Sequence, residues 1–116
     1  WAADKAPVHC VLSLQSLEHD PHWDLTLDAA VGLLREDGLL VVTCAGPGCE
    51  PHELKDCPSP GYYRNVSVME VCTAVVGAAS SRGLRVVNGA MKTDTSPRYP
   101  APSRSRTMAW FEVKRG

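Results

Sequence analysis

Two short apolar runs separated by a helical pattern constrain the fold of this chain more than any other feature. The runs are residues 8–14 (VHCVLSL) and 39–45 (LLVVTCA), and both are rich in β-branched and aliphatic side chains. Near-continuous apolar runs of this length are typical of parallel strands that are buried on both faces. Between them, an apolar stripe that recurs every three or four residues predicts an amphipathic helix; the stripe consists of Trp23, Leu27, Ala30 and Leu34. The sequence therefore predicts a β-α-β unit.

The expected limits of this first helix follow from residues that favour helix ends. Asp20 and Pro21 suit an N-cap and the first helical position. Asp37 and Gly38 suit the other end, because glycine readily adopts the left-handed conformation found just after a helix. We therefore expect the helix to lie between these two pairs.

The second half of the chain predicts one more helix and two strands. Ser67 and Glu70 form a capping-box pattern, so a helix should begin at Ser67 and end near Gly83. Residues 84–90 and 107–114 read as strands with no helix between them, which predicts an antiparallel hairpin at the end of the chain. The predicted order is thus β-α-β-α-β-β, an α/β fold.

Length and composition indicate one domain, residues 1–116, with flexible loops at 46–63 and 93–106 that are rich in proline and polar residues. The net charge of -1 gives no indication of a nucleic-acid partner. No apolar run approaches the roughly 20 residues that cross a membrane, and the first residues lack the apolar segment of a signal peptide. We expect a cytoplasmic protein.

Five cysteines without a secretory signal indicate reduced thiols. Cys10, Cys44 and Cys72 lie in apolar segments and are expected to be small core residues. Three residues of the central loop have the side-chain types of a zinc site, namely Cys49, His52 and Cys57. Their spacing does not match a pair of Cys-x-x-Cys knuckles, so we predict no bound metal.

Three segments resemble a known family: LSLQSLEHD (12–20), LLREDGLLVVTCAGPG (33–48) and GYYRNVSVMEV (61–71). Together they are similar to the C-terminal half of class I S-adenosylmethionine-dependent methyltransferases, in particular small-molecule or phage-like members. The resemblance implies a partial Rossmann-like sheet and S-adenosylmethionine as the cofactor. It also implies that the chain begins at the fourth of seven strands, because the glycine-rich cofactor turn and the ribose-binding acid have no counterpart here. The chain alone is then expected to be inactive.

The resemblance implies a set of site residues at the carboxyl ends of the first two strands. Ser13, Leu14 and Gln15 would approach the methyl-bearing end of the cofactor, and Glu18 and His19 would bind the acceptor or act as a general base. Further residues would face or bind the acceptor: Trp23, Gly46, His52, Tyr62, Tyr63 and Asn65. Some relatives bind a divalent metal through Glu-x-x-Glu-His, but Gln15 replaces the first glutamate, which argues against a metal here.

A structural alternative stands beside each functional interpretation. Glu18 and His19 would then be solvated residues at a turn, Trp23 would pack into the core, and Tyr62 and Tyr63 would pin a loop.

Partners follow from the same two interpretations. A methyltransferase segment would act on a small-molecule acceptor and pair with a missing N-terminal half. The alternative is a non-catalytic α/β interaction module that pairs, as a homodimer or with another chain, through an exposed sheet edge.

Overall fold

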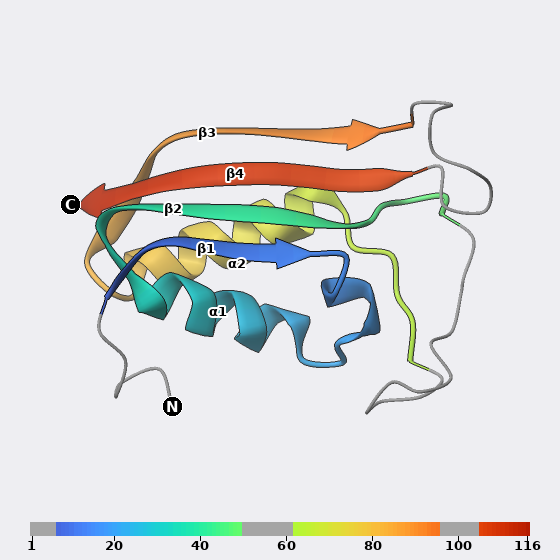
Figure 1. The fold of residues 1–116 in the computed structure, drawn as a ribbon, viewed down its shortest axis with the longest axis horizontal. Helices are drawn as coiled ribbons and strands as arrows, with labels where there is room; N and C mark the ends of the chain where they lie inside the picture. The colour runs from blue at the N-terminus through green and yellow to red at the C-terminus, as the bar shows by residue number, and fades with distance from the viewer. Residues whose placement is uncertain (1–6, 50–61, 96–104) are drawn as a thin grey trace.

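Four strands form the framework of the fold: β1 (Val8–Leu14), β2 (Leu34–Ala45), β3 (Leu84–Asp94) and β4 (Arg106–Arg115). The computed structural model describes residues 7–49, 62–95 and 105–116. The strands form one mixed sheet in the order β1-β2-β4-β3 (Figure 1). β1 and β2 are parallel, whereas β4 is antiparallel to both of its neighbours. The predicted α/β architecture is confirmed, and β3 and β4 form the predicted antiparallel pair.

Both helices cover the same face of the sheet. α1 spans Trp23–Leu33 and α2 spans Val68–Ser80, and they lie side by side against the strands (Figure 1). A short 3-10 turn, η2 (Leu17–His19), follows β1. The core lies between helices and sheet, and its largest fully buried apolar side chains include Phe111, Leu17, Leu27, Leu40 and Val31. Within the described residues, no helix has both the length and the apolar character needed to cross a membrane.

The predicted capping box at the start of α2 is confirmed. The Ser67 hydroxyl accepts a hydrogen bond from the backbone N–H of Glu70 at 3.2 Å, and the Glu70 carboxylate accepts one from the backbone N–H of Ser67 at 3.0 Å. Both donors would otherwise lack a partner in the first turn of the helix. Val66 and Val71 flank the capping box and are fully buried, at the two positions where apolar side chains form a hydrophobic staple across the start of a helix.

We expect the substitution Ser67→Ala to lower the free energy of unfolding by about 1 kcal/mol, because the Glu70 N–H loses its acceptor. Urea unfolding followed by circular dichroism measures the change. Ser80→Ala, at the exposed other end of α2, is the matched control and should change stability by less than about 0.5 kcal/mol. Equal effects of the two substitutions would contradict the role assigned to the cap.

The expected limits of the first helix are wrong at both ends. α1 begins at Trp23 with His22 as its N-cap, and Asp20 instead accepts a hydrogen bond from the backbone N–H of His22 at 2.8 Å. The helix ends at Leu33, because Leu34 is already extended and pairs with β1. Strand pairing therefore ends the helix earlier than the local glycine signal predicted.

Asp37 and Gly38 lie inside β2, where its register with β1 is irregular, instead of forming a helix cap. Asp37, and not the glycine, has the left-handed backbone conformation, with φ of 73°. A Cβ atom on Gly38 would lie 2.7 Å from the carbonyl oxygen of Arg35 and 2.9 Å from Cβ of Leu34. Glycine is needed here for close approach of the backbone rather than for a positive φ.

β1 is an edge strand, so the expectation that it is buried on both faces is wrong. Among the described strands it pairs with β2 alone, and the side chains of Leu12 and Leu14 are 62% and 57% exposed. Cys10 is also exposed, contrary to the expectation that it is a core residue, whereas Val11 packs against the core. Because side chains alternate along a strand, one face of β1 meets the helices and the other meets solvent.

The expected loop 93–106 is too long, whereas the described residues of the expected loop 46–63 lie in neither a helix nor a strand. β3 continues to Asp94 and β4 begins at Arg106, which shortens the second loop at both ends. In the first loop, the backbone N–H of Gly46 donates to the carbonyl oxygen of Ser105 at 3.2 Å. The expected flexibility of residues 50–61 and 96–104 concerns positions outside the described residues.

Candidate functional site

The turn after β1 places Glu18 and His19 inside the protein. Both belong to η2, and they are only 1% and 8% exposed. The segment that precedes α2 runs beside this turn, because the backbone N–H of Arg64 donates to the carbonyl oxygen of Glu18 at 2.9 Å. The alternative of solvated residues at a turn is therefore wrong for these two side chains.

A group of polar side chains surrounds His19. Its ring lies edge-on to the ring of Tyr63 with centroids 5.7 Å apart, and its Nδ1 lies 3.4 Å from the carbonyl oxygen of Tyr62. The Tyr63 hydroxyl donates to the Asn65 side-chain oxygen, and the Asn65 amide donates to the carbonyl oxygen of Cys49 at 3.0 Å. The structure thus brings five predicted site residues together in what we call the polar cluster: Glu18, His19, Tyr62, Tyr63 and Asn65.

Glu18 is the electrostatically unusual member of the polar cluster. Among the described residues, its Oε2 atom is buried without a hydrogen-bond partner. Burial first, and then the Glu18 carboxylate, raises the pKa of the Cys44 thiol to about 12. Burial, Cys49 and Glu18 also raise the pKa of Tyr63. Both groups stay protonated at neutral pH, and Oε2 of Glu18 keeps unused capacity to accept a hydrogen bond within the part of the chain that the structure describes.

Gln15 lies at the carboxyl end of β1 in a strained conformation. Its φ is 53°, which is unusual for a residue other than glycine, and strain of this kind concentrates at functional sites. Its backbone N–H donates to the Thr43 carbonyl oxygen at 2.7 Å, and its side-chain amide donates to the Thr43 hydroxyl at 3.0 Å. Gln15 and Thr43 line a depression of about 240 Å³ together with Arg106 and Met108. We call it the end depression.

The remaining predicted cofactor residues differ in their surroundings. The Ser13 hydroxyl lies 3.1 Å from the Ser16 hydroxyl, and Leu14 is exposed on the sheet face that has no described helix.

Trp23, which was predicted to face the acceptor, is half-buried against the core at the start of α1, and the Arg64 guanidinium lies 5.6 Å from its ring centroid. Trp23 also borders a hollow between the two helices, with Asp24, Met69 and Glu70 among the lining residues.

Gly46 is explained by packing. A Cβ atom at this position would lie 2.9 Å from the Ser105 hydroxyl and 3.0 Å from the backbone nitrogen of Thr107. No side chain larger than hydrogen fits between β2 and the start of β4 without movement. His52, the other predicted acceptor residue of this loop, lies outside the described residues.

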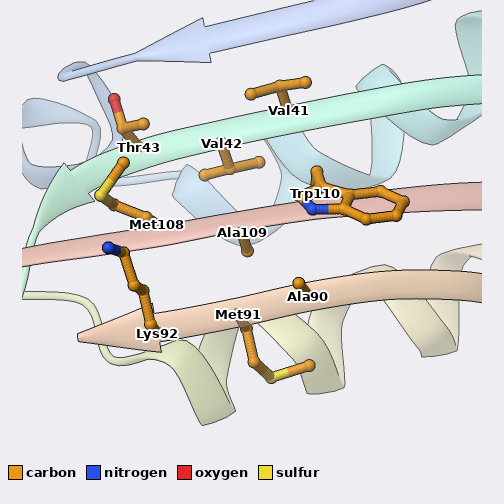
Figure 2. Close-up of a pocket in the computed structure, with 9 residues that line it drawn as sticks. All are labelled: Val41, Val42, Thr43, Ala90, Met91, Lys92, Met108, Ala109 and Trp110. Carbon is orange, nitrogen blue, oxygen red and sulfur yellow. The ribbon is translucent and has the colours of Figure 1, made fainter. Parts of the chain in front are cut away.

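A third hollow runs over the face of the sheet opposite the helices (Figure 2). It has a volume of about 270 Å³, and eight of its nine lining residues are uncharged. We call it the open-face groove, and it is lined by Val41, Val42, Thr43, Ala90, Met91, Lys92, Met108, Ala109 and Trp110. It shares Thr43 and Met108 with the end depression. The two hollows therefore adjoin.

Sequence reasoning missed the contributions of β4 to both hollows. The pattern Leu39-x-Val41-x-Thr43 on β2 pairs with Glu112, Trp110 and Met108 on β4. This alternation was a possible signal of a strand with one core face and one open face, but the continuous apolar run was read as burial on both faces.

In the ranges that the structure covers, no cluster of three or more His, Cys, Asp or Glu side chains that could hold a metal ion is present.

Comparison with known proteins places the fold but not the activity. No family model and no curated protein matches this sequence. Among solved structures, the chain is similar to one in the complex between the Haloferax volcanii Trm112 methyltransferase activator and "the putative methyltransferase". The match has a TM-score of 0.59 at 14% identity and covers 96% of this chain and 56% of that chain. At this identity the likeness concerns the fold alone, and this chain spans little more than half of the similar one.

Proposed function

We propose that this chain is a fragment or subunit of an S-adenosylmethionine-dependent methyltransferase and supplies the acceptor-side half of its active site. The observation that carries the proposal is the sheet topology, in which the antiparallel β4 lies between β2 and β3 next to a parallel pair. This is the arrangement that the family resemblance implies for the C-terminal half of these enzymes. The fold similarity to a chain of the Trm112 complex supports the same proposal.

The described residues do not accommodate the whole cofactor. The end depression has about 240 Å³, whereas small-molecule and cofactor pockets usually have roughly 300–1,000 Å³. The glycine-rich turn that the resemblance requires is also absent from the sequence. We therefore assign to this chain the acceptor side only, and we expect it to be inactive alone.

The polar cluster suits the recognition of a small acceptor that donates a hydrogen bond. Oε2 of Glu18 has an unused lone pair in a buried position. A hydrogen bond that the methyl acceptor donates to this carboxylate would be strong, because the carboxylate is charged and shielded from water. His19 lies beside it and can take a proton from an N–H or O–H group. Gln15, held by two hydrogen bonds to Thr43, fixes the end of β1 beside the end depression.

A nuclear magnetic resonance titration with S-adenosylhomocysteine, the demethylated product, tests the proposal. We expect weak saturable shifts of the backbone amides of Leu14 and Gln15, with a Kd of about 1 mM or weaker because half of the site is missing. Gln15→Asn keeps a residue that tolerates positive φ but shortens the amide, and it should weaken these shifts. Chemical-shift changes scattered over the surface, or the same changes with adenine alone, would count against binding of the methyl-bearing end of the cofactor at Leu14 and Gln15.

A second candidate function is a non-catalytic interaction module. The observation that favours it is the outer edge of β1, which pairs with no other described strand and carries the exposed Leu12 and Leu14, because proteins usually protect such edges. Failure of S-adenosylhomocysteine to bind, together with pairing at this edge, would favour this second function.

A further inference from the structure

Glu18 carries a buried charge that no described side chain neutralises. The residue is 1% exposed, and its Oε2 atom has no hydrogen-bond partner among the described residues. The ion pairs in the same part of the chain use other carboxylates, namely those of Asp28, Glu36, Asp37, Glu70 and Asp94. Glutamate is almost never fully buried unless it is paired, because burial of a lone carboxylate is costly. A bound cation would supply the missing counter-ion.

The surroundings of Glu18 favour a positive charge on a bound molecule. Burial first, and then the Glu18 carboxylate, raises the pKa of the Cys44 thiol to about 12. The pKa of Tyr63 is raised by burial first and then by Cys49 and Glu18, whereas Arg106 lowers it. A thiol or phenol that entered these surroundings would stay protonated, and a carboxylate would be repelled. An amine gains most here, because it carries a positive charge at neutral pH.

The side chains around Glu18 suit an organic ammonium group better than a metal ion. Calcium and magnesium bind to several oxygen ligands at once. Within the described ranges, no group of three or more His, Cys, Asp or Glu side chains could hold a metal ion. An ammonium N–H needs only one carboxylate oxygen as its acceptor, and Oε2 of Glu18 provides it.

His19 meets the second requirement of an amine acceptor, which is removal of a proton. An ammonium ion has no lone pair and becomes a nucleophile only after it loses a proton. His19 follows Glu18 in η2 and is 8% exposed, and its Nδ1 lies 3.4 Å from the carbonyl oxygen of Tyr62. An imidazole can take the proton from the ammonium group, which leaves an imidazolium ion and a neutral amine with its lone pair. Glu18 would thus hold the cation and His19 would make it reactive.

We infer that Glu18 binds the ammonium group of a small primary or secondary amine, and that this amine is the methyl acceptor. The identification of the amine as the methyl acceptor deepens the proposed methyltransferase function and rests on it. The ammonium site itself rests on the burial of Glu18 and on the unused hydrogen-bond capacity of its Oε2 atom.

A nuclear magnetic resonance titration of the chain with ethylammonium chloride tests the inference. The carbon-13 resonance of the Glu18 carboxyl group reports both its protonation and the binding of a cation. We expect an ionised carboxylate at neutral pH and saturable shifts with a Kd of about 1–10 mM, because a single small cation makes one charge-assisted hydrogen bond. Tetramethylammonium has the same charge but no N–H group, and it should bind at least about tenfold more weakly.

Two glutamates provide matched variants. Glu18→Gln keeps the shape of the side chain but removes its charge, and it should weaken ethylammonium binding at least about tenfold, as measured on the backbone amides of Leu17 and His19. Glu70→Gln removes the charge of a carboxylate that already pairs with Arg64 and keeps a side chain suited to the capping box. It should leave ethylammonium binding unchanged. Circular dichroism checks that both variants are folded.

Four results would overturn the inference: a protonated Glu18 carboxyl group at neutral pH, which needs no counter-ion, absence of saturable ethylammonium binding, equally tight binding of tetramethylammonium, or equal effects of the two variants. The S-adenosylhomocysteine titration follows Leu14 and Gln15 and is read separately. Its failure contradicts the methyltransferase proposal and leaves the ammonium site intact, whereas failure of ethylammonium to bind contradicts the amine acceptor and leaves the result for S-adenosylhomocysteine unaffected.

Discussion

Replacing Phe111 by alanine is expected to lower the free energy of unfolding by about 3–5 kcal/mol. Phe111 is 1% exposed and is the only phenylalanine of the chain. It lies on the central strand β4, between Leu40 of β2 and Gly89 of β3, and faces the core. Alanine would leave a cavity in the core between the sheet and the helices. A loss of this size is a large fraction of the stability of an ordinary domain, which is about 5–15 kcal/mol.

Urea unfolding followed by tryptophan fluorescence measures this loss. Leu14→Ala is the control within the same sheet, because Leu14 is 57% exposed and should change stability by about 0.5 kcal/mol or less. A loss below about 1 kcal/mol for Phe111→Ala would mean that the sheet and helices do not share a packed core at this position.

Replacing Glu18 by methionine is expected to raise the free energy of unfolding by about 1–3 kcal/mol. Glu18 is 1% exposed, and its buried Oε2 has no hydrogen-bond partner among the described residues. Burial of such a group is costly, and an apolar side chain of similar length removes the cost while it keeps the volume. If Glu18 binds the methyl acceptor, Glu18→Met should lower the activity of the assembled protein while it raises the stability of the chain.

Glu70→Met is the matched control for this prediction. The Glu70 carboxylate accepts from the Ser67 backbone and pairs with Arg64, so its loss should destabilise the chain by about 1 kcal/mol. The same substitution thus has opposite signs at a satisfied and an unsatisfied carboxylate. Thermal unfolding measures both, and a destabilised Glu18→Met protein would show that the carboxylate has a stabilising partner.

The candidate site was partly predictable from the sequence. Glu18 and His19 were expected at the end of the first strand, and Tyr63 and Asn65 were expected to share a site with them; the structure brings all four together. Arg106 was not expected at the site, because it reaches Gln15 only through the pairing of β4 beside β2. Pairing between segments so distant in the chain leaves no local pattern in the sequence.

The sequence by itself determined the order of the helices and strands and the start of α2, because the capping box at Ser67 involves only residues within one helical turn. The tertiary structure decided three further features: the end of α1 at Leu33, the exposed face of β1, and the burial of Glu18. Each of these depends on which distant segment packs beside the residue. Local propensities are small, and pairing and burial with a distant neighbour outweigh them.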